Sequence, residues 1–396
     1  MPEVPAGALH VQKETVFKQL ELHPRLLEGI AGLGFTKPTP IQAQAIPPAL
    51  AGRDILACAA TGSGKTAAFL LPIAHHLIER PRGTTRALVL TPTRELAAQI
   101  LEDFRDLAGR TRLTGAAVHG GVAMSPQVEA FRRGVDVMVA TPGRLLDHFR
   151  SPHGRLPGLE YLVLDEADRM LDIGFLPDIR RVLQHLPKNR QTLFFSATMP
   201  PPIVQLTREL LRDPVTVNLH RHAKPASGIS HAAYPVLQTL KAGLLLALLK
   251  RGGVRQALVF TRTKHRANRL TAYLVRNGIQ AERIHGNRSQ SQRTAALAGF
   301  RKGRHRVLVA TDIAARGIDI EALGHVVNFD VPTVADDYIH RVGRTARAEL
   351  TGTALTLVSP EEESTWRAIE RAVGTRIERV TVPEFDYAER AVTGRA

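Results

Sequence analysis

A short apolar run followed by a glycine-containing loop is the feature that most restricts how this chain can fold. The run Ile55-Leu56-Ala57-Cys58 predicts a strand, and the apolar stretch that starts at Ala67 predicts a helix. A strand, a glycine loop ending in Gly-Lys-Thr and a helix form the phosphate-binding arrangement of α/β proteins. Backbone N–H groups and the helix N-terminus stabilise phosphate charge there. We therefore expect a nucleoside triphosphate to bind the loop Ala59, Ala60, Thr61, Gly62, Ser63, Gly64, Lys65 and Thr66.

Two side chains of this loop have a defined chemistry. Lys65 can reach the outer phosphates, and the Thr66 hydroxyl can ligate Mg²⁺. Ala59 stands where the first glycine of such loops is usual, which is a departure from the general pattern. The alternative is a glycine loop that arose by chance, and the strand and helix on either side argue against it.

Length and composition indicate the class of protein. A chain of 396 residues is too long for one ordinary core and predicts two or three domains. No apolar run approaches the roughly 18–20 residues that cross a bilayer, and the N-terminus lacks a signal-peptide pattern. Cys58 is the only cysteine, which excludes an internal disulfide and a cysteine-based zinc site. We expect a cytoplasmic protein with no membrane segment.

Apolar segments that alternate with helical patterns predict a parallel sheet in the first half of the chain. Continuous apolar strands of this kind are covered by helices on both faces. The predicted strands are 87–90, 116–118, 135–140, 161–164 and 192–195.

The second half of the chain repeats the first. Residues 87–94 resemble residues 257–264, and residues 137–141 resemble residues 307–311 at the same offset. The chain is therefore predicted to contain two copies of one α/β domain. The expected boundaries are 1–215 for the first domain, 216–235 for a linker, 236–385 for the second domain and 386–396 for a tail.

The repeat fails at the phosphate loop. The same offset applied to residues 59–66 reaches residues 229–236, which contain no Gly-Lys-Thr. Only the first copy can hold a triphosphate by this mechanism, and the second copy carries a group of arginines instead. One nucleotide site completed by a second domain predicts a cleft that closes. The arginines are Arg341, Arg344 and Arg347.

Two acidic residues follow the predicted strand 161–164. Carboxylates at the carboxyl end of a buried parallel strand, beside a phosphate loop, can hold Mg²⁺ and activate water. Asp165 would belong to the Mg²⁺ shell, and Glu166 is the candidate general base. The alternative is an acidic helix N-terminus without a ligand, and the nearby Lys65 loop favours the catalytic interpretation.

Several segments together resemble the motifs of DEAD-box ATP-dependent RNA helicases. The match runs in the family's order from about residue 15 to residue 360, and the bacterial RhlE-type subgroup is the most similar. The resemblance implies two tandem RecA-like domains, each a mostly parallel sheet with helices on both faces. The matching segments are 34–42 with Gln42, the loop 59–66, Asp165-Glu166-Ala167-Asp168, Ser196-Ala197-Thr198 and residues 340–347.

The resemblance implies which residues recognise ATP. Gln42 would read the amino group and N7 of adenine, and Phe17 would stack on the base. Lys37 belongs to the same motif as Gln42, and Asp319 would contact the ribose. A helix-capping glutamine and a core phenylalanine are the alternatives for Gln42 and Phe17.

The resemblance also assigns roles in closure and catalysis. Arg344 and Arg347 match arginine fingers that neutralise charge on the γ-phosphate. If the segment is helical, their spacing of three would place both on one face. His340 and Arg341 would bridge to the first domain. A basic helix face is the alternative for these arginines. The residues that would couple the nucleotide site to closure are Asp168, Ser196 and Thr198.

A net charge of +16 favours a polyanionic partner. The resemblance implies that both domains hold one RNA strand by its backbone, through hydroxyls, arginines and glycines that permit close approach. Aromatic residues make up only 5% of the chain, so recognition should tolerate sequence and distinguish RNA by its 2′-OH. The expected RNA-binding residues are Pro92, Thr93, Arg94, Gly120, Gly121, Thr141, Gly143 and Arg144, then Thr261, Arg262, His285, Gly286, Gln290, Arg293, Thr311 and Asp312.

The sequence thus predicts a monomeric RNA helicase that uses ATP and Mg²⁺, with ribosome assembly and RNA decay both compatible. An ATP-regulated RNA clamp or chaperone is one alternative, and a DNA-dependent ATPase is another. His340 and Gln42 favour the DEAD-box interpretation over related processive helicases.

Overall fold

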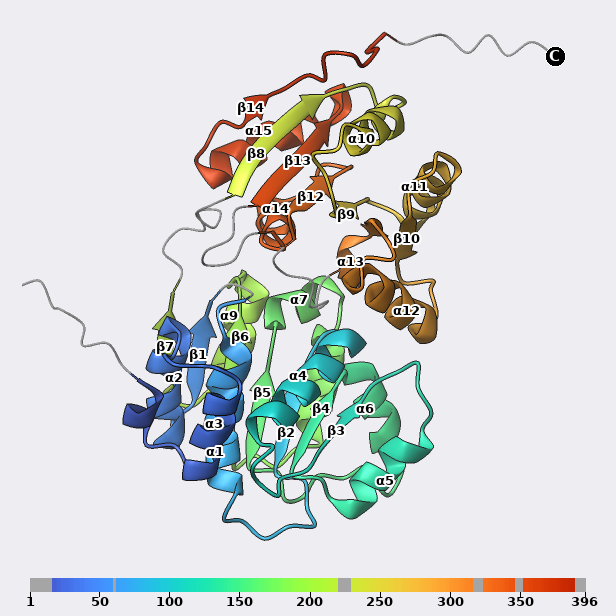
Figure 1. The fold of residues 1–396 in the computed structure, drawn as a ribbon. Coiled ribbons are helices and arrows are strands. Elements are labelled where there is room, and N and C mark those ends of the chain that lie inside the picture. Colours follow the sequence, from blue (N-terminus) through green and yellow to red (C-terminus); the bar gives the residue numbers. More distant parts are fainter. Residues whose placement is uncertain (1–15, 60–61, 220–228, 316–322, 346–351, 389–396) are drawn as a thin grey trace, which may run out of the picture. The chain divides into compact units, whose positions relative to one another are not determined.

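The computed structural model describes residues 16–59, 62–219, 229–315, 323–345 and 352–388 (Figure 1). The chain divides into two compact units, and each is described by itself. The first contains residues 1–119 and 124–219, and the second contains residues 120–123 and 220–396. Among the described residues, no helix combines the length and the apolar character needed to cross a membrane.

The first unit is built on a seven-stranded sheet in the order β3-β4-β2-β5-β6-β1-β7, with every neighbouring pair parallel. All the strands expected in this half are present. The helices are η1 (Phe17–Leu20), α1 (Pro24–Gly32), α2 (Pro40–Leu50), α3 (Lys65–Leu77), α4 (Arg94–Leu107), α5 (Ser125–Arg133), α6 (Pro142–Phe149), α7 (Ala167–Asp172), α8 (Leu176–Gln184) and α9 (Pro201–Leu210). The strands are β1 (Ile55–Cys58), β2 (Ala87–Leu90), β3 (Gly115–Val118), β4 (Val137–Ala140), β5 (Tyr161–Leu164), β6 (Gln191–Ser196) and β7 (Val215–Asn218).

Both faces of this sheet are buried, because successive side chains of a strand point to opposite sides. In β2, Ala87 and Val89 belong to the apolar cluster with helices α1 to α4, while Leu88 and Leu90 belong to the cluster with α5 to α9. Burial of each leucine stabilises the fold by about 1.5–3 kcal/mol. The continuous apolar runs in the sequence thus reflect two covered faces, as Figure 1 shows.

The second unit repeats this plan with a sheet in the order β10-β11-β9-β12-β13-β8-β14, again parallel throughout. Each position matches one of the first sheet, so β8 corresponds to β1 and β12 to β5. The strands are β8 (Ile229–Pro235), β9 (Ala257–Phe260), β10 (Ala281–Ile284), β11 (Val307–Ala310), β12 (His325–Asn328), β13 (Gly352–Val358) and β14 (Glu378–Arg379). The helices are α10 (Lys241–Lys250), α11 (Lys264–Arg276), α12 (Gln290–Arg301), α13 (Asp312–Ala315), α14 (Ala335–Val342), η2 (Pro360–Glu362) and α15 (Glu363–Val373).

The expected α/β fold in two copies is confirmed. The stretch expected as a linker, 216–235, contains most of β7 and all of β8. β7 pairs with β1, and β8 pairs with β13, so both ends of this stretch belong to the sheets of the two units. Residues 220–228, between the two strands, lie outside the described residues.

Candidate nucleotide and nucleic-acid site

The phosphate loop joins β1 to α3 in the first unit, as expected. Gly64 has φ 90°, and a Cβ at this residue would lie 2.6 Å from Nε2 of Gln42, so only glycine fits. Lys65 is the first residue of α3, and its buried Nζ donates a hydrogen bond to the carbonyl oxygen of Ala59 at 3.0 Å. The lysine therefore folds back over its own loop. Ala60 and Thr61 lie outside the described residues, and Gly62, Ser63 and Thr66 complete the loop.

Gln42 connects α2 to this loop. Its Oε1 accepts a hydrogen bond from the backbone N of Thr39 at 2.9 Å, and its Nε2 donates one to the carbonyl oxygen of Gly64 at 3.1 Å. The helix-capping alternative is therefore observed, together with a link to the loop that the sequence did not predict. Phe17 is 5% exposed and packs in the core, so the structure favours its core alternative. Lys37 is exposed.

Asp165 directly follows the central strand β5 and is 3% exposed. Its Oδ1 accepts a hydrogen bond from the backbone N of Glu166 at 2.9 Å. Burial raises the pKa of Asp165 to about 6, while Lys65 opposes this shift and the Glu166 carboxylate adds to it. An ionised carboxylate here is costly unless a cation joins it, which suits a metal ligand.

Asp165→Asn is expected to stabilise the folded protein by about 1–3 kcal/mol at pH 8. The folded pKa of about 6 lies above the ordinary value of 3.8, so ionisation of Asp165 lowers stability as the pH rises through 6. The gain should fall by about half at pH 5, where the folded carboxyl is mostly protonated. Urea unfolding at both pH values measures this, with the exposed Asp147→Asn as the control. A gain independent of pH would contradict the electrostatic cause.

Glu166 adopts a strained backbone conformation at the N-cap of α7. Its φ of 51° is in the left-handed region, which costs a non-glycine residue about 1–3 kcal/mol. Its carboxylate forms an ion pair with Arg169, and both side chains are largely buried. Arg169 was not predicted, although an arginine three residues along a helix is the sequence signal for such a pair.

The acidic segment is joined to the end of the neighbouring strand β6. The Asp168 carboxylate accepts hydrogen bonds from N and Oγ1 of Thr198 at 2.7 and 2.9 Å. Oγ of Ser196 accepts one from the backbone N of Asp168 at 3.2 Å and donates one to the carbonyl oxygen of Thr198 at 2.7 Å. The structure thus brings together the three residues that are expected to couple the nucleotide site to closure.

The segments expected to bind RNA follow β2, β4 and β3, which form the other half of the same sheet edge. Thr93 is the N-cap of α4, and its side chain accepts a hydrogen bond from the backbone N of Leu96 at 3.3 Å. Arg144 contacts Met124 through its guanidinium. A Cβ at Gly143 would meet open space, so this backbone can be approached closely. Pro92 and Arg94 flank Thr93, Thr141 is the N-cap of α6, and Gly120 and Gly121 follow β3.

The corresponding strands β9, β10 and β11 carry the segments expected in the second unit. The side chains of Thr261 and His285 are almost fully buried, and their proposed contact to RNA stays a prediction. His285 hydrogen-bonds Asn268 at 3.0 Å, and burial lowers its pKa. A sequence does not reveal such burial, because it depends on how neighbouring helices pack. Arg262 is half-exposed, Gly286 faces open space, Gln290 and Arg293 lie on α12, and Thr311 precedes Asp312 in α13.

Arg341 is held by partners within the second unit. It is 3% exposed, and its guanidinium binds both carboxylate oxygens of Asp312 at 2.6 and 2.8 Å. It also donates to Asn328 at 3.1 Å and to the carbonyl oxygen of Asp330 at 2.8 Å. Arg341 thus stabilises its own unit, and the expected bridge to the first domain stays a prediction. Its aliphatic and charged parts are hidden because α14 packs on β12.

The arginine segment is not one continuous helix. α14 contains His340 and ends at Val342, so Arg344 lies beyond the helix and is largely buried. The shared helix face is expected only if the segment is helical, and this condition is not met at Arg344. Arg347 and Asp319 lie outside the described residues.

Two family models together match most of the chain. The model described as DEAD/DEAH box helicase matches residues 39–206, and the model described as helicase conserved C-terminal domain matches residues 240–349. These matches fall on the first and the second unit.

Curated relatives and solved structures agree with this assignment. The chain is 43% identical to the ATP-dependent RNA helicase SrmB of Escherichia coli over 95% of this chain and 86% of that protein. It is 42% identical to the RNA helicase CrhR of Synechocystis over 95% of this chain and 76% of that protein. S. cerevisiae Dbp5 bound to RNA and ADP BeF3 is similar with a TM-score of 0.84, at 32% identity over 92% of this chain and 95% of that one. The chain therefore belongs to the family of DEAD-box helicases.

Proposed function

We propose that this protein binds RNA and ATP together, hydrolyses ATP when RNA is bound, and separates short RNA duplexes locally. One observation carries the proposal. The segments proposed to bind the nucleotide follow β1, β5 and β6, whereas the segments proposed to bind RNA follow β2, β4 and β3. A single edge of the first sheet therefore carries both sets side by side. The second sheet repeats the strands that precede the RNA-binding segments, but its strand β8 is not followed by a phosphate loop.

The residues of the first unit have complementary roles in hydrolysis. Lys65 and the backbone of its loop would hold the outer phosphates, and Glu166 would accept a proton from the attacking water. Thr66 and Asp165 supply hard oxygen ligands that suit Mg²⁺, which uses few protein ligands and keeps several waters. Mg²⁺ would neutralise charge on the phosphates. Arg344 and Arg347 would stabilise the negative charge on the γ-phosphate.

The hydrogen bonds between Asp168, Ser196 and Thr198 support a coupling role. They tie the residues beside Glu166 to the loop after β6, so movement of that loop would shift the acidic segment. RNA that orders the loop would thereby favour hydrolysis.

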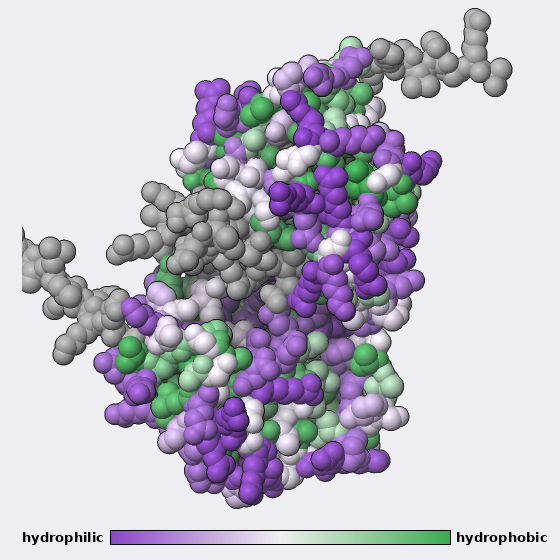
Figure 2. Space-filling model, in the orientation of Figure 1, coloured by the Kyte–Doolittle hydropathy of each residue, from purple (hydrophilic) through white to green (hydrophobic). Residues whose placement is uncertain are grey.

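RNA as the partner is supported by the basic surface. Hydrophilic side chains gather over α11 and α12 on the face in Figure 2. Similar structures were solved with RNA, including Mss116p bound to ssRNA and AMP-PNP, with a TM-score of 0.84 and 27% identity over 93% of this chain and 79% of that one. A monomeric state, a cytoplasmic location, the RhlE-type subgroup and a role in ribosome assembly or RNA decay stay predictions from the sequence. The exposed basic residues on and after these helices include Arg269, Arg276, Arg301, Lys302 and Arg304.

ATP hydrolysis measured without nucleic acid, with RNA and with DNA of the same sequence tests the proposal. RNA is expected to stimulate phosphate release, and a short RNA duplex is expected to separate in the same reaction. Equal stimulation by DNA would favour a DNA-dependent ATPase. Stimulation by RNA without strand separation would favour a clamp.

Gln42→Ala is expected to lower the preference for ATP over GTP by about 10–100-fold. The change removes the proposed contact to adenine and the observed hydrogen bond to Gly64, so the KM for ATP should rise as well. Hydrolysis of both nucleotides at saturating RNA measures the ratio of kcat/KM. Gln44→Ala, an exposed glutamine on the same helix, is the matched control. Unchanged discrimination would refute the adenine-reading role.

A further inference from the structure

A buried carboxylate joins several parts of the second unit. Oε1 of Glu362 accepts hydrogen bonds from Nη2 of Arg262 at 3.0 Å and from the backbone N of Val331 at 3.2 Å. Its Oε2 accepts from N and Oγ of Ser359, both at 3.2 Å, and binds Nζ of Lys241. The Glu362 side chain is 6% exposed. A charge in this position is stabilised only because its partners surround it.

Lys241 occupies the place that Lys65 has in the first unit. Each lysine is the first residue of the helix that follows a corresponding strand, α3 after β1 and α10 after β8. Nζ of Lys241 is fully buried and also donates to the carbonyl oxygen of Phe329 at 2.9 Å. In the second unit, the lysine at the corresponding position is therefore paired with a carboxylate of the protein itself.

The Glu362 carboxylate also restrains Arg262. Arg262 lies after β9, within the segment that corresponds to Pro92–Arg94 of the first unit. Its Nη2 additionally donates to the carbonyl oxygen of Val331 at 3.3 Å, and its backbone N donates to Asp330 at 2.7 Å. About half of the side chain (48%) is exposed, so the guanidinium is restrained at one nitrogen while an external phosphate can still reach it. An arginine restrained in this way loses less conformational entropy on binding.

We propose that Glu362, neutralised by Lys241, is a positioning residue that holds Arg262 in the orientation that contacts an RNA phosphate. The inference rests on the proposed role of Arg262 in RNA binding. The inference gives the pair of Lys241 and Glu362 in the second unit a function, because this pair would position a contact to RNA.

A double-mutant cycle tests this inference on the full chain. Binding of a fluorescent single-stranded RNA is measured by anisotropy in the presence of AMP-PNP, for Arg262→Ala, Glu362→Gln and the double variant. Arg262→Ala is expected to weaken binding about tenfold and to reduce the salt dependence by about 0.7 in log–log slope. Glu362→Gln should weaken binding about threefold or more. In the Arg262→Ala background, the second change should have no further effect.

Controls separate positioning from loss of folding. Glu361→Gln changes an exposed neighbour of the same type and should bind RNA like the wild type. Thermal unfolding of each variant shows whether it is folded at the assay temperature. Glu362→Asp keeps the charge beside Lys241 but withdraws it from Arg262, so it should reproduce the loss of RNA affinity if Glu362→Gln does not fold.

Two results would overturn the inference. If Arg262→Ala weakens binding while the folded Glu362 variants bind normally, or if the two losses add in the double variant, Glu362 does not act through Arg262. If Arg262→Ala binds RNA like the wild type, the proposed RNA contact of Arg262 fails, and the positioning role fails with it.

Discussion

Glu166→Gln is expected to lower kcat for RNA-stimulated ATP hydrolysis by about 10²–10⁴-fold, the typical contribution of a general base. Glutamine keeps the size and hydrogen-bonding capacity of the side chain but does not accept a proton at neutral pH. The affinity for ATP should stay within a few-fold, because Lys65 and its loop are unchanged. RNA should dissociate more slowly in the presence of ATP, since release is proposed to follow hydrolysis.

Phosphate release, nucleotide displacement and RNA dissociation rates measure these three effects separately. Glu102→Gln, on the exposed face of α4, is the matched control and should behave like the wild type. A folded Glu166→Gln protein that retains more than about a tenth of the RNA-stimulated rate would exclude Glu166 as the general base. A rise in the KM for ATP with unchanged kcat would instead point to a binding role.

Arg341→Met is expected to lower the free energy of unfolding of the second unit by about 3 kcal/mol. The guanidinium is buried, binds Asp312 through two hydrogen bonds and lies 5.1 Å from the ring centroid of Phe260. Methionine fills part of the volume but leaves the Asp312 carboxylate and the Asn328 amide without these donors. The midpoint of thermal unfolding should fall by roughly 6–12 °C.

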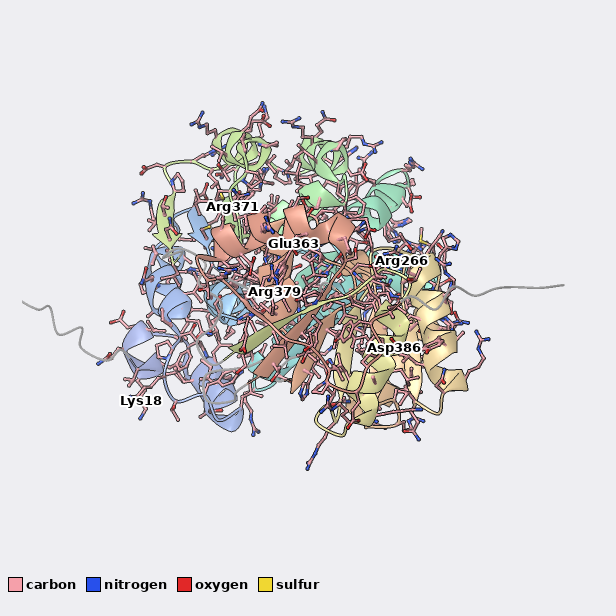
Figure 3. All side chains as sticks on the ribbon, turned by 90° about the horizontal axis from the view of Figure 1, so that it is seen from above. Lys18, Arg266, Glu363, Arg371, Arg379 and Asp386 are labelled. Atoms are coloured by element: carbon pink, nitrogen blue, oxygen red, sulfur yellow. The ribbon has the colours of Figure 1, made fainter. Side chains whose placement is uncertain are left out.

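Calorimetry of the full chain without nucleotide and RNA measures this loss. The control is Arg371→Met on α15, an exposed arginine on the helix that also carries Glu363 (Figure 3). A bridging role alone would leave the ligand-free stability unchanged and reduce only RNA-stimulated hydrolysis. A midpoint within about 2 °C of the wild type would therefore argue that Arg341 acts mainly as the expected bridge and contributes little to the stability of its own unit.

Local patterns account for the part of the fold that the sequence predicted. Strands such as β2 and β9 are continuous apolar runs, because helices cover both faces of each sheet. Thr93 and Thr263 each cap the helix that follows, so the repeat is visible in residues that are close in the chain. Gly64 is required by its own positive φ. Each of these features leaves a pattern in residues that are close together in the chain.

The surroundings of several site residues depend on distant partners, which the sequence did not predict. Arg341 binds Asp312, which lies 29 residues away in the chain. Buried His285 forms a hydrogen bond with Asn268 in a neighbouring helix. The loop after α14 illustrates the same point, because Arg344 leaves the helix that its spacing suggested. The positions of these side chains depend on packing between distant segments, which cannot be predicted from the spacing of residues along the chain.

The sequence by itself determined the α/β class, the repeat, the phosphate loop and the acidic residues after β5, since strand, loop and helix propensities are local. Only the tertiary structure decided how the two corresponding lysines differ. Lys65 folds back on the carbonyl oxygen of Ala59 in its own loop, whereas Lys241 is paired with Glu362, which lies 121 residues away in the chain. The charged ammonium group of fully buried Lys241 is stabilised by a carboxylate, and only the folded chain brings that carboxylate to it.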